Sequence, residues 1–283
     1  MISYKKCSEV SEDKIFEAFQ IGFSDYMIQF NMSKDFFIQR FFGPEGNGIE
    51  HSFIALDEDK AVGLNLGGIK VYEGTKTLRC GALCIHPEYR GTELSKRLFE
   101  LHKEVAVETC CKQMFLEVIA GNDRAISFYK KMGYEKVYDM EYYSHNNPTE
   151  LKRDVPNNIK IERIDMDTLI NFRQGIHDIH INWQNDLDYI SQIEGQVHYG
   201  VFKDKSLIGG LSIHTKGKVS FLWIGSKHRH QGIGSNLIYH AVKELSIEKL
   251  SINFSNNVKL LGFIKCLNFS KDSISQYEMY QFL

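Results

Sequence analysis

The pattern of apolar and polar residues predicts the same order of helices and strands in both halves of the chain. In the first half, helices are predicted over residues 11–19 and 34–42, the second with Ser33 as its N-cap. Short apolar runs predict strands at residues 52–56, 61–71, 78–85, 114–119 and 134–143. Two further helices are predicted, one beginning near Leu94 and one over residues 124–131. This order indicates the α/β class, with a mixed sheet and helices packed against it.

Three segments of the first half recur in the second half, in the same order and at nearly one spacing. The matched positions are residues 53–63 with 199–209, Arg90 with Arg229, and Asn122 with Asn257, at offsets of 146, 139 and 135. A period this long excludes a solenoid, whose repeats are about 20–50 residues long. The repetition therefore indicates a duplicated domain.

A linker is predicted at residues 144–158, where turn-forming residues and two of the four prolines gather. We therefore expect one domain over residues 1–145 and a second over residues 158–283. A chain of 283 residues is long enough for two ordinary domains.

Composition narrows the possible partners and compartments. A net charge of −2 offers no general attraction to nucleic acid or to an anionic membrane, so we expect neither as a partner. No apolar run is long enough to span a bilayer, and the first residues lack the apolar core of a signal peptide, which predicts a cytoplasmic protein. The six cysteines form no C-x-x-C pair and no zinc spacing, so we expect reduced thiols and no metal. The sequence does not define an oligomeric state.

The turn at residues 229–234 carries the clearest chemical signal. It follows a short apolar strand, residues 221–224, and leads into a predicted helix. The first N–H groups of a helix have no helical partner, and the helix dipole adds partial positive charge there. Glycines at positions 232 and 234 let a ligand approach the backbone closely. These features predict a phosphate site, and a pyrophosphate would suit it. Residues 90–95 form a weaker version of the same turn.

These turns and their surroundings resemble the GCN5-related N-acetyltransferase (GNAT) superfamily, whose motif is Arg/Gln-x-x-Gly-x-Gly/Ala. Residues 229–234 match it at every fixed position, whereas the first turn keeps Arg90 but has Glu93 and Ser95 at the two small-residue positions. The family's later motif is matched by residues 116–134. Residues 23–26, 183–185 and 276–279 are similar to a bacterial branch with tandem domains. The resemblance implies two tandem GNAT-like domains.

The resemblance also implies an acetyl-CoA-dependent N-acetyltransferase, with CoA held by the turns and by the strands before them. The positions that it assigns to CoA are Leu83, Cys84, Ile85, Arg90, Gly91, Thr92, Glu93, Leu94, Ser95 and Asn122 in the first half, and Trp223, Ile224, Arg229, His230, Gln231, Gly232, Ile233, Gly234 and Asn257 in the second. A backbone N–H near residues 84–85 or 223–224 would stabilise the oxyanion. Asn122 and Asn257 are equally suitable as helix caps.

The resemblance places the proton donor for the leaving thiolate at Tyr129, and the matched residue in the second half, Ile264, cannot donate. We therefore expect catalysis in the first half, although Glu93 would repel phosphate there. In the second half we expect a CoA-binding or structural partner of the first. The alternative is a non-catalytic chain that binds CoA as a sensor or interaction module.

The base and the acceptor site are less sharply defined. Glu117 is the first candidate base, with Asp25, Tyr26 and water-mediated proton removal as alternatives. Phe23, Asp25 and Tyr26 are expected to line the acceptor site, unless they only end a helix. The acceptor is expected to be a small molecule or a peptide that presents a primary amine.

Overall fold

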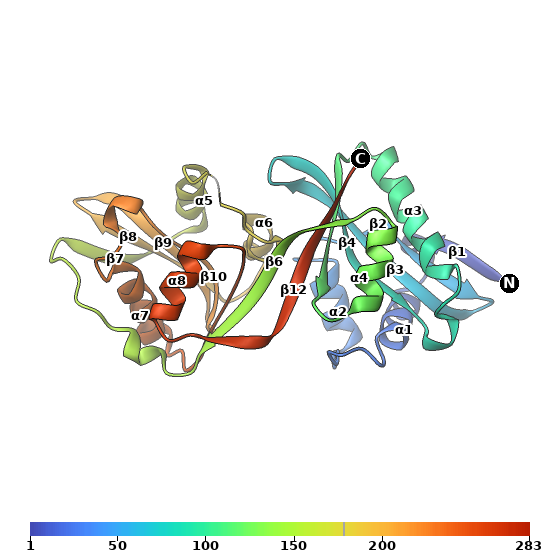
Figure 1. Cartoon of the computed structure of the whole chain (residues 1–283), viewed down its shortest axis with the longest axis horizontal. Coiled ribbons are helices and arrows are strands. Elements are labelled where there is room, and N and C mark those ends of the chain that lie inside the picture. The colour runs from blue at the N-terminus through green and yellow to red at the C-terminus, as the bar shows by residue number, and fades with distance from the viewer. Residues whose placement is uncertain (178) are drawn as a thin grey trace. The chain divides into compact units, whose positions relative to one another are not determined.

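The computed structural model describes residues 1–177 and 179–283, which form two compact units. Unit 1 contains residues 1–137 and 277–283, and unit 2 contains residues 138–276. This division differs from the expected consecutive ranges, 1–145 and 158–283. The strand that ends each sequence repeat makes contacts in the other unit: most of β6 (Glu135–His145) belongs to unit 2, and the end of β12 (Ser270–Phe282) belongs to unit 1 (Figure 1).

Unit 1 is a sheet with two helices on each face. Its strands lie in the order β1-β2-β3-β4-β5-β12, and all the pairs from β1 to β4 are antiparallel, while β4 and β5 are parallel. The strands are β1 (Ile2–Lys6), β2 (Gly48–Asp57), β3 (Lys60–Tyr72), β4 (Thr75–Ile85) and β5 (Gln113–Ile119). The helices are α1 (Glu12–Gly22), α2 (Lys34–Phe41), α3 (Leu94–Glu108) and α4 (Asp123–Lys131), with short 3-10 helices at Cys7–Glu9 and Pro87–Tyr89.

Alternation along the strands explains these layers, because successive side chains of a strand point to opposite faces. In β2, Phe53 and Ala55 join the core under α3 and α4, whereas Ile54 and Leu56 join the core under α1 and α2. The predicted cap of α2 is confirmed, since the Ser33 hydroxyl accepts a hydrogen bond from the Phe36 N–H at 3.3 Å.

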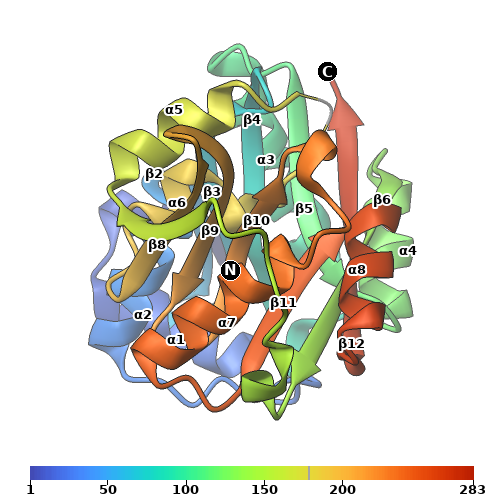
Figure 2. The ribbon, with the colours of Figure 1, turned by 90° about the vertical axis from the view of Figure 1, so that its left-hand side faces the viewer.

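Unit 2 repeats this arrangement with shorter elements, as Figure 2 shows from one side. Its strands lie in the order β12-β6-β11-β10-β9-β8-β7. They include β7 (Ile159–Ile164), β8 (Gln196–Lys203), β9 (Ser206–His214), β10 (Lys218–Ile224) and β11 (Leu250–Ser255). The helices are α5 (Met166–Gln174), α6 (Leu187–Ile190), α7 (Ile233–Leu245) and α8 (Val258–Cys266), with 3-10 helices at Pro148–Leu151, Trp183–Asn185 and Ser226–His228.

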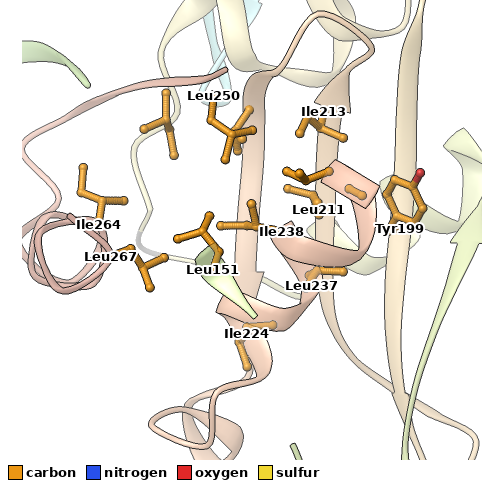
Figure 3. Packing of buried hydrophobic residues seen from close by; sticks show 14 of the residues in the cluster. Leu151, Tyr199, Leu211, Ile213, Ile224, Leu237, Ile238, Leu250, Ile264 and Leu267 are labelled. Carbon is orange, nitrogen blue, oxygen red and sulfur yellow. The ribbon is translucent and has the colours of Figure 1, made fainter. Parts of the chain in front are cut away.

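The main core of unit 2 lies between its sheet and the helices α7 and α8. Leu237 and Ile238 of α7 and Ile264 of α8 are fully buried there against strand residues such as Leu211 (Figure 3). A smaller core on the opposite face joins α5 and α6 to Phe221. Across the described residues of both units, no helix is both long and apolar enough to cross a membrane.

Candidate active site

The sheet of unit 1 opens between β4 and β5. The two strands pair from Thr77 with Gln113 to Cys80 with Leu116, and no pairing between them is found further along. On its other edge, β4 continues to pair with β3 as far as Ile85, after a register shift at the bulged Gly81. The end of β4, residues 81–85, therefore has one edge that no neighbouring strand occupies. This is where the sequence placed Leu83, Cys84 and Ile85 for pantetheine and thioester contacts.

The first turn, residues 90–95, is open to solvent. Gly91 adopts a left-handed conformation with φ of +80°, and no atom of another part of the described chain lies within 4 Å of the position that a Cβ would take. Thr92 is also exposed, and α3 begins at Leu94 with Ser95 in its first turn. The first-turn N–H groups of α3 are therefore accessible to an anion.

The side chain of Glu93 does not block this turn. It is 85% exposed and forms an ion pair with Lys96 one helical turn along, at 3.1 Å. Its carboxylate thus points to solvent beside a cation, while its backbone remains in the turn. The repulsion of phosphate that the sequence predicted is reduced by this geometry.

Arg90 holds the turn in place. Its Nε donates to the carbonyl of Ile85 at 3.1 Å, and one Nη donates to the carbonyl of Gly22 at 3.1 Å. Both carboxylate oxygens of Asp25 accept hydrogen bonds from the same guanidinium, at 2.5 and 2.6 Å. The sequence assigned Arg90 to the cofactor and Asp25 to the acceptor, and the structure brings the two together as an ion pair. This hydrogen-bonded pair lowers the pKa of Asp25, so the carboxylate stays ionised at neutral pH.

Tyr129 projects from α4 into the core beside the opened sheet. Its helix begins at Asn122, whose side-chain oxygen caps it by accepting from the Ala125 N–H at 3.2 Å. Tyr129 is 8% exposed, and its hydroxyl lies close to the thiol of Cys80 on β4. Burial first, and then the nearby Cys80, raises the pKa of Tyr129 well above its usual value of 10. The phenol is therefore protonated at neutral pH, so it carries the proton that a donor must have.

Two of the predicted acceptor residues lie near Tyr129 on an aromatic segment. The pKa of Tyr26 is affected by the side chain of Asn122 and the pKa of Tyr129 by Tyr26, which places these three residues close together. Phe23 packs its ring 5.1 Å from Tyr26 and 5.2 Å from Phe30. The sequence did not single out Phe30, although its helix-like spacing from Phe23 and Tyr26 could have done so.

Glu117 is buried on β5 in an ion cluster that the sequence did not predict. Arg79 of β4 donates to one oxygen of Glu117 from Nε at 3.1 Å and from Nη at 2.6 Å, and it also binds Glu45 at 3.0 Å. The other oxygen of Glu117, Oε1, has no hydrogen-bond partner in the described part of the chain. Burial raises the pKa of Glu117, the charge of Arg79 lowers it in part, and the nearby carboxylates of Glu278 and Glu45 raise it further. The sequence offered one signal for this ion pair: Arg79 and Glu117 are charged residues that each lie within an otherwise apolar strand.

The second turn, residues 229–234, has the expected backbone but a different environment. The Nε of Arg229 donates to Ile224 at 2.8 Å, as Arg90 does to Ile85, and the guanidinium lies over the ring of Trp223. Gly232 is left-handed, with φ of +73°, and precedes the first helical residue, Ile233. His230, Gln231 and Gly234 complete the turn, and Asn257 caps α8 through its side chain. As in unit 1, the sheet opens beside it, since β10 pairs with β11 only at Lys218 and Val219.

Two features separate this turn from the first. The chain's own residues 151–154 lie against it: a Cβ on Gly232 would be 2.7 Å from the carbonyl oxygen of Asp154. The position matched to Tyr129 is Ile264, which is fully buried and cannot donate a proton. Among the residues that the structure describes, an open turn, an opened sheet and a protonated phenol come together only in unit 1.

Comparison with known proteins agrees with this geometry. The chain matches the acetyltransferase (GNAT) family twice, over residues 14–134 and 164–269. A 99-residue region is 34% identical to N-alpha-acetyltransferase 30 of Schizosaccharomyces pombe, and covers 33% of this chain and 64% of that relative, so the chain spans slightly less than two thirds of the relative's length.

Solved structures share the fold at low sequence identity. A tandem GNAT protein from the clavulanic acid biosynthesis pathway superimposes with a TM-score of 0.72 at 13% identity, covering 100% of this chain and 98% of its own. A GCN5-related N-acetyltransferase from Sphaerobacter thermophilus gives 0.68 at 10% identity, with coverage of 100% and 95%. The two family matches together span most of the sequence, and the chain belongs to the acetyltransferase (GNAT) family, whose model it matches twice in succession.

Proposed function

We propose that unit 1 transfers an acetyl group from acetyl-CoA to a primary amine. The observation that carries this proposal is Tyr129, a buried phenol held in its protonated form next to the opened end of β4. The family match supports acyl transfer to an amine, and the geometry of unit 1 supports acetyl-CoA as the donor.

The residues of unit 1 fit a CoA thioester. The open turn at Gly91 and the first turn of α3 suit the pyrophosphate, because they place accessible backbone at the positive end of a helix. The free edge of β4 at residues 81–85 suits the amide groups of pantetheine, and a backbone N–H of Cys84 or Ile85 suits the thioester oxygen. A bound thioester supplies the activated acetyl group.

The side chains then account for the two proton movements. As the amine nitrogen bonds to the acetyl carbon and the C–S bond breaks, the Tyr129 hydroxyl donates its proton to the departing sulfur. The amine loses its own proton to a base. The Oε1 atom of Glu117 fits that role, because it is the oxygen that Arg79 does not bind and the pKa of this carboxyl is raised. A water molecule is the alternative acceptor of this proton.

The acceptor approaches along the aromatic segment that carries Phe23 and Tyr26. Tyr26 lies close to Asn122 and to Tyr129, so this segment lies next to the proposed proton donor. Asp25 acts by fixing the segment to Arg90 rather than by binding the acceptor, since both its oxygens are engaged. The relative named as an N-alpha-acetyltransferase makes peptide N-terminal amines the first acceptors to test.

The test is amine-dependent release of CoA from acetyl-CoA by the full chain. The panel contains short peptides with free N-termini, the same peptides with blocked N-termini as controls, polyamines, aminoglycosides and lysine derivatives. We expect thiol release with at least one free amine and none with the blocked peptides. Calorimetric binding of CoA without amine-dependent release across the panel would instead favour a CoA-binding module without catalysis.

A further inference from the structure

The second turn is in contact with a segment of the same chain, residues 151–154. A Cβ built on Gly232 would lie 2.7 Å from the carbonyl oxygen of Asp154 and 3.1 Å from the Cβ of Arg153. Within the first turns of α7, the hydroxyl of Ser235 donates a hydrogen bond to the carbonyl oxygen of Leu151. The glycine that lets a ligand approach the backbone is thus approached by the chain itself.

This segment is anchored and does not behave as a loose linker. Leu151 is 2% exposed and packs in the main core of unit 2, near Leu237, Ile238 and Leu267 (Figure 3). Arg153 folds back on its own segment, with one Nη donating to the carbonyls of Glu150 at 3.1 Å and Lys152 at 2.7 Å. Burial of a leucine side chain contributes roughly 1.5–3 kcal/mol, so the segment is not displaced without cost.

The carbonyl oxygens of the segment also complement the turn electrostatically. The N-terminal end of α7 carries partial positive charge, which is the property that attracts a phosphate. The carbonyl oxygens of Leu151 and Asp154 bring partial negative charge to the same place. A pyrophosphate would have to replace these contacts, whereas nothing in the described chain lies within 4 Å of a Cβ position at Gly91 in the first turn.

We infer that residues 151–154 occupy the second turn in place of a cofactor phosphate, and that the chain binds one CoA, in unit 1. The second repeat, which matches the phosphate motif best in sequence, then serves as a structural partner. This reverses the sequence-based expectation that residues 229–234 hold CoA. The location of the one bound CoA rests on the proposed function, but the occupation of the second turn does not.

Calorimetry with CoA and a pair of matched variants test the inference. Thr92 and Gln231 are exposed residues at equivalent positions of the two turns. Thr92→Glu adds one negative charge to the first turn, and Gln231→Glu adds one to the second. We expect one CoA per wild-type chain. Thr92→Glu should weaken binding by at least about fivefold, since unit charges at contact repel by about 1 kcal/mol even in water. Gln231→Glu should leave affinity and stoichiometry unchanged. Two CoA molecules per chain, or loss of binding in Gln231→Glu, would overturn the inference.

Hydrogen exchange separates this inference from the proposed function. Upon CoA addition we expect protection of residues 88–96, with no change at residues 148–156 or 229–236. Protection of 229–236 together with faster exchange at 148–156 would show that CoA displaces the segment, and would refute the inference whether or not the protein is catalytic. Protection at neither turn would agree with the occupation of the second turn by residues 151–154, but it would overturn the proposed CoA site in unit 1.

Discussion

Tyr129 and Tyr134 are two buried tyrosines in the same core of unit 1, and they differ in what their hydroxyl groups contact. Tyr129 lies close to Tyr26 of the aromatic segment as well as to Cys80, whereas Tyr134 is affected by Cys80 alone and its hydroxyl has no hydrogen-bond partner among the described residues. Burial raises the pKa of both well above 10, so both are protonated at neutral pH. Position, and not acidity, therefore distinguishes the proposed proton donor.

This difference makes Tyr134→Phe the control for Tyr129→Phe. Each change removes one hydroxyl from a buried ring and keeps the ring. We expect Tyr129→Phe to lower kcat by about 10²-fold with little change in CoA affinity, because a positioned acid acts only in the transition state. Tyr134→Phe should keep kcat within about twofold. Steady-state kinetics with the accepting amine and CoA calorimetry check this, and equal kcat values in the two variants would remove Tyr129 from the mechanism.

Glu117 and Glu45 form a second matched pair, because both carboxylates bind Arg79. If Glu117 takes the proton of the amine, Glu117→Gln should lower kcat by about 10²-fold, whereas Glu45→Gln should mainly lower stability. In the wild type the base works ionised, so kcat should fall as the pH drops through the pKa of Glu117. Since burial raises that pKa, this fall should occur above the range of an ordinary glutamate. In Glu117→Gln, the remaining kcat should not show this fall at low pH. Equal kcat losses in both variants would indicate that the cluster supports the site without acting as base.

At the scale of the elements, residues 151–154 have the composition of a linker, yet Leu151 packs in the main core of unit 2. We expect Leu151→Ala to destabilise unit 2 by about 2–4 kcal/mol, because it opens a cavity against α7 and α8. Lys152→Ala, at the neighbouring exposed position, should change stability by less than about 0.5 kcal/mol. Midpoints of urea unfolding, monitored in unit 2 by Trp183 and Trp223 fluorescence, measure both changes. Similar midpoints would show that the segment is not anchored in solution.

The helices and strands can be predicted closely from local sequence, whereas the contacts between distant segments cannot. Ser33 caps its helix as predicted, because an N-cap depends on a few adjacent residues. The turn at residues 90–95, read as a weaker form of the motif, and the role of Tyr129 were predicted from motifs and remain predictions. In contrast, the contact of residues 151–154 with Gly232 joins positions far apart, and no local pattern records it. Leu151 offered a partial signal, as an apolar residue in a polar stretch. The Arg79–Glu117 pair also depends on strand register, which single strands do not specify.

At the scale of the whole molecule, the two units exchange strands: most of β6 belongs to unit 2, and the end of β12 belongs to unit 1. Because of this strand exchange, neither sequence repeat contains a complete unit. Met279 and Tyr280 of β12 are buried in unit 1, where Tyr280 packs against Phe115 of β5 at 4.9 Å. A chain that ends at Gln276 should therefore lose the fold and the activity of unit 1, since β5 would become an unpaired edge. A chain that ends at Gln281 lacks only the exposed Phe282 and Leu283 and should keep nearly full activity. Wild-type kcat in the shorter chain would contradict this dependence.

The same strand exchange sets an order for folding on the ribosome. Residues 277–283 are synthesised only after the whole of residues 138–276, yet unit 1 needs them to cover β5. Unit 1 is thus the first to be translated and cannot be completed until unit 2 has emerged, whereas unit 2 finds most of β6 already made. During this interval the nascent chain exposes an unpaired, largely apolar strand, which is prone to misassociation. The time needed to translate unit 2 therefore determines how long unit 1 remains without its last strand.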